Sequence, residues 1–154
     1  MNNHASSARF DSITRYLSWD HDRLDGLLDE ATRRVEAGDL VEARSIFSAF
    51  DDGLRRHIRL EEELLFPLFE ARTGMRHGPT AVMRTEHRAI ETELARMSHG
   101  LEAGDSSDYA TGLANLYCVL GPHNVKEEQV LYPTTDDMLD ALERRDFVNR
   151  LTGS

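Results

Sequence analysis

One motif occurs twice in this chain. The two copies are HIRLEEELLFP, which starts at His57, and HNVKEEQVLYP, which starts 66 residues later at His123. Each copy has a histidine, a glutamate four residues further on, a leucine, an aromatic residue and a proline. The glutamates that follow each histidine by four residues are Glu61 and Glu127. A repeat of this length predicts that the chain contains two copies of one helical unit.

The same offset of 66 residues relates other parts of the chain. His21 corresponds to His87, and the EAGD at residues 36–39 corresponds to the EAGD at residues 102–105. Four of the seven histidines and two glutamates therefore share one register. This register predicts a duplicated helix pair whose halves face each other around a metal.

Apolar residues recur every three or four positions along most of the chain, which is the spacing of amphipathic helices. We expect an all-α fold, an up-down-up-down four-helix bundle over residues 9–134 with short connections. Gly38 and Gly104 should end the first and third helices, and Asp39 should cap the second. Pro67 should kink or limit the second helix, and Gly121-Pro122 should kink or widen the fourth beside His123.

The two ends of the chain should lie outside this bundle. Residues 1–8 are polar and predict a flexible tail, and residues 135–154 predict a short terminal helix and tail. Thr135 or Asp136 is the expected cap of that helix.

Composition excludes several functional classes. The net charge of −10 argues against a nucleic-acid partner, because phosphate contacts need a basic surface. No apolar run is long enough to serve as a signal peptide or to cross a membrane, so we expect a cytoplasmic protein without a membrane partner. Cys118 is the only cysteine, which excludes an intrachain disulfide and a cysteine-rich metal site.

The histidines and glutamates of the register suit a metal centre. Residues four apart project from one face of a helix, so each motif presents an imidazole and a carboxylate together. His21 and His87 lie in apolar stripes and should also point inward. Imidazole and carboxylate together suit two first-row metal ions. We expect one ion at His21 and His57 and a second at His87 and His123, with Glu61 and Glu127 each spanning both.

Several neighbouring residues have more than one interpretation. Glu91 and Asp25, one turn after His87 and His21, are either additional ligands, acceptors for a ligand or solvated acids. For the other acids beside the motifs, exposed surface charge is the simpler expectation, although they can also orient an imidazole; they are Asp20, Glu62, Glu86 and Glu128. The tyrosines are potential radical or proton donors, but packing is the simpler role; they are Tyr16, Tyr117 and Tyr132.

With these residues placed, the chain resembles the hemerythrin-like (HHE cation-binding) family of four-helix-bundle, non-haem di-iron proteins over roughly residues 10–134. The order of the motifs, H…HxxxE…H…HxxxE, carries the resemblance. It implies two iron ions with an oxo or hydroxo bridge. The implied iron ligands are His21, His57, Glu61, His87, His123 and Glu127, with Glu91 as a further candidate.

The chain departs from the oxygen-carrying members of that family. Those proteins place two histidines one turn apart on the third helix, where this chain has His87 and Glu91, and they use a longer His-to-Asp spacing on the fourth helix. A harder ligand set favours ferric iron, which works against reversible oxygen carriage. We therefore expect reaction with a small oxidant, by peroxide breakdown or by handling of O2 or nitric oxide. The alternative is a non-catalytic module that binds or senses iron, O2 or nitric oxide.

Overall fold

A computed structural model describes residues 10–153, and these residues form helices joined by short turns. The prediction of an all-α fold is confirmed. The predicted tail at residues 1–8 lies outside the described residues. The elements, in chain order, are α2 (Ile13–Glu36), α3 (Leu40–Leu60), the π-helical turn η1 (Glu61–Leu65), α4 (Phe66–Thr73), α5 (Pro79–Ala103), α6 (Ser106–Lys126), the π-helical turn η2 (Glu127–Leu131), α7 (Tyr132–Asp137) and α8 (Ala141–Thr152).

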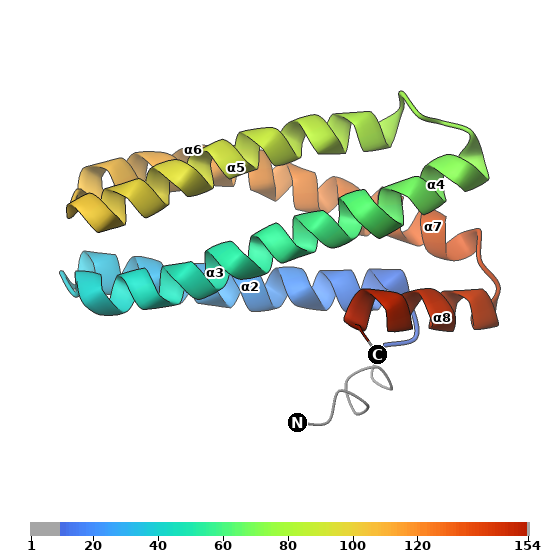
Figure 1. The fold of residues 1–154 in the computed structure, drawn as a ribbon, viewed down its shortest axis with the longest axis horizontal. Coiled ribbons are helices and arrows are strands. Elements are labelled where there is room, and N and C mark those ends of the chain that lie inside the picture. The colour runs from blue at the N-terminus through green and yellow to red at the C-terminus, as the bar shows by residue number, and fades with distance from the viewer. Residues whose placement is uncertain (1–9, 154) are drawn as a thin grey trace.

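The long helices lie lengthwise beside one another (Figure 1). α2 packs against α3, α5 packs against α6, and α3 also contacts α5. The α2–α3 and α5–α6 turns lie at one end of the molecule, and the α4–α5 connection lies at the other (Figure 1). The chain therefore reverses direction at each of these connections (Figure 1). The short helix α8 lies against α2.

The helix ends follow the sequence signals. The carboxylates of Asp39 and Asp105 accept hydrogen bonds from backbone N–H groups three residues later, at the starts of α3 and α6. Gly38 and Gly104 adopt φ angles of +76° and +70°, a left-handed conformation that glycine tolerates best. These residues set the tight turns that bring the helices of each pair alongside one another.

A π-helical turn follows each His-x3-Glu motif. The N–H of Phe66 donates to the carbonyl of Glu61, and the N–H of Tyr132 donates to the carbonyl of Glu127, in both cases across five residues. Pro67 and Pro133 explain both turns, because a proline lacks the N–H and its ring crowds the carbonyl four residues earlier. π turns of this kind are frequent at functional sites.

The expectation of a widened turn beside His123 was wrong in its position and its cause. Gly121 and Pro122 both lie inside α6, and the widened turn η2 begins only at Glu127. The other half contains the same turn without a Gly-Pro pair, so the prolines after the motifs control the geometry.

The C-terminal helix begins later than predicted. Its cap is Asp140, which forms a reciprocal capping box with Glu143, whereas Thr135 and Asp136 belong to α7. Asp136 instead accepts hydrogen bonds from the N–H groups of Ile13 and Thr14, both at 2.9 Å. This carboxylate caps the start of α2, so the last part of the chain holds the first helix in place.

The apolar core has two parts. One cluster lies toward the α2–α3 turn and includes Leu28, Phe50 and Leu94. The other lies toward α8 and includes Leu17, Leu65 and Leu151. Because α8 contributes to this second cluster, it packs into the core with the long helices. The site histidines and glutamates are buried but belong to neither cluster.

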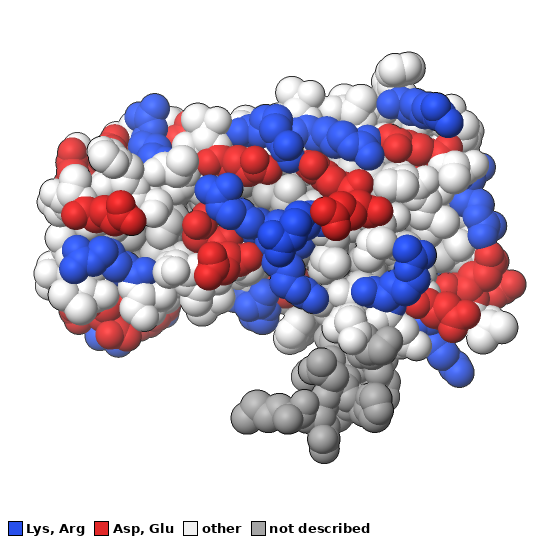
Figure 2. Space-filling model, viewed as in Figure 1, with Lys and Arg blue, Asp and Glu red and all other residues white. Residues whose placement is uncertain are grey.

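The surface carries both signs of charge. Figure 2 shows acidic and basic side chains interleaved on one long face of the molecule. Of the helices within residues 10–153, none has both the length and the apolar character needed to cross a membrane.

Candidate metal centre

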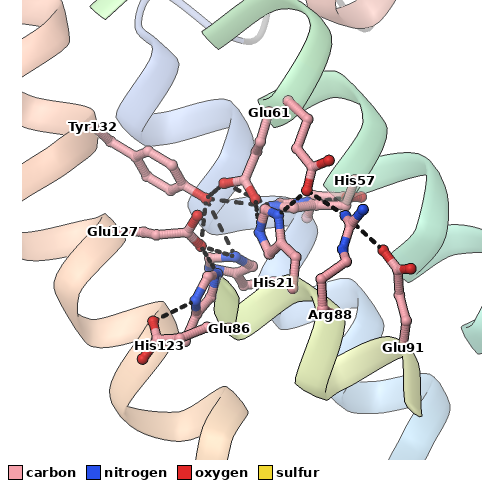
Figure 3. Close-up of polar contacts among 12 residues, drawn as sticks. His21, His57, Glu61, Glu86, Arg88, Glu91, His123, Glu127 and Tyr132 are labelled. Carbon is pink, nitrogen blue, oxygen red and sulfur yellow. Dashed lines mark hydrogen bonds and ion pairs between the residues drawn. The ribbon is translucent and has the colours of Figure 1, made fainter. Parts of the chain in front are cut away.

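The register residues meet in a buried polar cluster (Figure 3). Each of the six is at most 3% exposed. α2 and α5 each supply one histidine, whereas α3 with η1 and α6 with η2 each supply a histidine and a glutamate. The structure thus brings together His21, His57, Glu61, His87, His123 and Glu127.

Each buried carboxylate contacts one histidine from each half of the repeat. Glu61 lies 3.6 Å from His57 Nε2 and 3.1 Å from His87 Nε2. Glu127 Oε1 lies 3.3 Å from both His21 Nε2 and His123 Nε2. All four imidazoles therefore turn Nε2 inward, and each carboxylate spans the gap between the halves.

Two overlapping sets of these atoms are close enough to hold a metal ion. The potential ligand atoms of each set lie within 4.8 Å of one another. The first set is Glu61, His87, His123 and Glu127, and the second is His21, His57 and Glu127. The first set thus contains His87 and His123 and the second contains His21 and His57, while Glu127 belongs to both sets and Glu61 only to the first.

Carboxylates on neighbouring helices orient two of the imidazoles. Asp20 Oδ2 lies 2.9 Å from His57 Nδ1, and Glu86 Oε1 lies 3.0 Å from His123 Nδ1. An acceptor at Nδ1 fixes the ring and leaves Nε2 free to bind a metal. The expectation that Asp20 and Glu86 are surface charges was therefore wrong. Both positions are acidic in the 66-residue register, which is the signal that the sequence offered.

The two remaining imidazoles are held differently. Glu62 Oε2 lies 2.7 Å from His87 Nδ1, and Arg88 donates to the same oxygen at 2.5 Å. The equivalent carboxylate in the other half, Glu128, lies 3.5 Å from His21 Nδ1, and that nitrogen has no hydrogen bond. His21 is therefore the least fixed of the four rings.

Tyr132 reaches the centre of the cluster. Its fully buried hydroxyl donates to Glu61 Oε2 at 2.6 Å and lies 3.0 Å from Glu127 Oε1. The hydroxyl oxygen of Tyr132 also lies 3.2 Å from His57 Nε2 and 3.3 Å from His21 Nε2. Tyr132 does pack in the apolar cluster near α8, as expected, but its hydroxyl also has a polar role that was not expected. The 66-residue register aligns Tyr132 with Phe66. The sequence therefore indicated that the second copy of the motif has a hydroxyl at this position and the first copy has none.

Phe66 occupies the equivalent position without a polar atom. Its ring stacks on the imidazole of His87, with centroids 5.5 Å apart and planes 13° from parallel. The half of the cluster that contains His87 and His123 is therefore covered by an apolar ring, and the other half contains a phenol.

The buried charges shift the protonation of the cluster. Burial acts to lower the pKa of His57, but the charge of Glu61 and hydrogen bonds to Asp20 and Glu61 outweigh it and raise this pKa to about 10. Burial likewise acts to lower the pKa of His123, and hydrogen bonding to Glu127 with nearby charges raises it to about 9. Burial acts to raise the pKa of Glu61, but the charge of His57 holds it well below its usual range.

The donor set fits bound metal better than it fits protons alone. Glu127 Oε2 and His21 Nδ1 are buried with no hydrogen-bond partner. A buried polar atom left in this state costs free energy of about 1–3 kcal/mol. Metal ions bound at the inward nitrogens and carboxylate oxygens would replace protons that now neutralise the cluster, and they would give Glu127 Oε2 a partner.

Other residues considered from the sequence lie apart from the cluster. Glu91 forms an ion pair with Arg88 at 2.9 Å, one turn before it on α5, and points away from the centre in Figure 3. It belongs to neither set of potential ligand atoms. Tyr117 is 46% exposed, and Tyr16 packs with Phe10 in the apolar cluster near α8.

Comparison with known proteins identifies related sequences. Residues 12–135 match the hemerythrin HHE cation binding domain family. An uncharacterized protein from Mycobacterium bovis and two from strains of Mycobacterium tuberculosis are each 29% identical over 130 residues. Each alignment covers 77% of this chain and 50% of the relative, so the chain spans about half the length of these relatives. No solved structure is significantly similar to the chain.

Proposed function

Because this chain belongs to the hemerythrin HHE cation-binding family, we propose that it is a non-haem di-iron protein that breaks down hydrogen peroxide. The contacts of the two carboxylates carry the proposal. Glu61 contacts His57 and His87, and Glu127 contacts His21 and His123. Carboxylates that reach both halves of a histidine cluster suit two adjacent ions.

We assign one iron to His21 and His57 and the other to His87 and His123, with Glu61 and Glu127 reaching both. The iron pair, when bound, would give two electrons to one peroxide molecule and take two electrons back from the next. Two molecules of peroxide then give two of water and one of O2, with no external reductant. O2 and nitric oxide are further small molecules that such a pair can bind.

The protein would contribute proton control and a dry environment. The hydroxyl oxygen of Tyr132 lies 2.6 Å from Glu61 Oε2 and donates to it, and burial, with the charges of Glu127 and Glu61, raises the pKa of this hydroxyl well above its usual value. We assign Tyr132 the delivery of a proton to the substrate oxygen. Leu65 and Phe66, both 0% exposed, limit water around the cluster.

Metal analysis with a visible spectrum tests the centre. We expect two irons per chain and the absorption of an oxo-bridged ferric pair. Zinc, or no metal, in protein purified from iron-replete cells would remove the basis of the proposal.

Oxygen evolution tests the reaction. Iron-loaded protein mixed with peroxide should release one O2 for every two peroxides. Tyr132→Phe should keep its iron and lose about 100–10,000-fold in rate, the usual contribution of one positioned proton donor. Tyr109→Phe is the matched control. Tyr109 is also buried, but it lies in the apolar cluster toward the α2–α3 turn, where its hydroxyl is hydrogen-bonded to Thr32. Normal iron content without turnover would instead indicate a binding or sensing module.

A further inference from the structure

A cavity of about 300 Å³ adjoins one side of the metal centre. It lies between α2 and the α6–η2 segment, and His21 forms part of its wall. Its other lining residues are Asp22, Asp25, Asp29, Tyr117, Leu120, Gly121, Asn124 and Glu128. The cavity therefore connects an imidazole of the centre with a group of four carboxylates.

The negative charge of this cavity is not compensated by nearby cations. Within residues 10–153, no arginine or lysine forms an ion pair with Asp22, Asp25, Asp29 or Glu128. Most other acids near the centre do have such partners, as Asp20 has Arg23. Carboxylates one turn apart on a helix destabilise it slightly, so their grouping here works against stability.

Two buried polar atoms without partners also belong to residues that line the cavity. His21 is 3% exposed, and its Nδ1 has no hydrogen bond. Asn124 Oδ1 is likewise buried and unbonded. The corresponding nitrogen of His57, His87 and His123 is in each case bonded to a carboxylate. His21 Nδ1 is thus available to a ligand from the cavity, unlike the other three.

The equivalent place in the other half of the repeat has an arginine and a bonded histidine nitrogen. In the 66-residue register, Arg88 corresponds to Asp22. Arg88 binds Glu62, which in turn is bonded to His87 Nδ1. Asp22 stands where the other half has this arginine, so Glu128 has no cationic partner among the described residues. The cavity beside His21 is therefore acidic.

We propose that this cavity is the entry site for ferrous ions, which bind Asp25, Asp29 and Glu128 before they pass His21 into the centre. The inference rests on the proposed di-iron function. Carboxylate oxygens suit a hydrated divalent ion, and imidazole nitrogen suits the same ion once it sheds water. A concave group of like charges concentrates counter-ions and raises their rate of association. Peroxide and O2 are uncharged and gain nothing from this field.

The test measures how fast metal-free protein takes up Co2+, a coloured and redox-stable substitute for Fe2+. Stopped-flow absorbance should show the double variant Asp25→Asn/Asp29→Asn loading about ten-fold more slowly than wild type at low salt. Its final absorbance should equal that of wild type. The rate difference should shrink to about two-fold or less near 0.5 M salt, where charges are screened over a few ångströms.

The control variant Asp52→Asn/Asp146→Asn changes the net charge equally, at exposed sites without ion pairs. It should load at nearly the wild-type rate. Equal rates for both double variants would refute the entry site, and so would a final absorbance that falls in proportion to the rate. If wild type takes up neither cobalt nor iron, the di-iron proposal fails and this inference fails with it.

Discussion

The two halves of the centre share a ligand frame and differ around it. Each half supplies two histidines and one glutamate in the same register. Around His87 and His123, Arg88 binds Glu62 and Phe66 covers His87. Around His21 and His57, the Tyr132 hydroxyl enters the cluster and an acidic cavity reaches His21. The repeat therefore explains where the candidate ligands lie, and the differences between its two copies explain how the two positions become unequal.

We expect the largest effect, on iron content, when one histidine is removed from either half of the repeat. His57→Ala and His123→Ala should each reduce iron to one ion per chain or fewer, because each ring is an expected ligand. His99→Ala is the control, since His99 is exposed on α5 and outside the register. Iron content by mass spectrometry or colorimetry checks the result. Two irons retained in both variants would show that the ligand assignment is wrong.

An intermediate effect should appear in the pH dependence of the metal-free protein. His57 and His123 have pKa values raised to about 10 and about 9. Their stabilising contribution is therefore complete below the unfolded value near 6.5 and is lost as pH rises through 9 and 10. Glu61 and Asp20 have lowered pKa values, so their contribution is present above about 4 and is lost in acid.

Urea unfolding between pH 6.5 and 10 measures this loss, which should amount to several kcal/mol. The His57→Gln variant separates the contributions of the two histidines. The stability of this variant should stop falling near pH 9, where His123 has lost its proton. A wild-type stability that stays flat from pH 6.5 to 10 would contradict the assigned charge states.

We expect the smallest effects, on stability and on the rate of metal loss, when the residues that distinguish the two halves are exchanged. Arg88→Asp removes the cation that binds Glu62, and Asp22→Arg supplies one near Glu128. Each change should alter stability by less than about 1 kcal/mol, the usual range for exposed ion pairs. Loss of Co2+ to a chelator should be a few-fold faster in Arg88→Asp and slower in Asp22→Arg. The same direction of change in both variants would show that these residues do not control access.

The buried cluster of histidines and glutamates could be predicted from the sequence because it depends on spacing within single helices. His57 and Glu61 share a helix face whatever lies opposite. The acids that orient the rings could not be assigned in this way, because Asp20 precedes His21 but bonds His57 on another helix. Such a contact depends on how the helices are aligned, which one sequence does not specify.

Tyr132 and Glu91 show the same limit. Tyr132 enters the cluster because η2 shifts the residues after Glu127, and no helical periodicity predicts that shift. Glu91 follows His87 by four residues, the spacing of a ligand on one helix face. However, Arg88 precedes Glu91 by three residues on the same helix and forms an ion pair with it. Glu91 therefore pairs with Arg88 in the structure and lies outside both sets of potential ligand atoms.

The division of the apolar core has a consequence for folding cooperativity. A layer of charged and polar side chains separates the two apolar clusters, and without metal it holds unbonded atoms such as Glu127 Oε2. The two ends of the metal-free bundle should therefore open to amide hydrogen exchange at different rates. Metal ligated by all four helical segments would tie these ends together. The centre would then act as the joint that makes the bundle unfold as one unit.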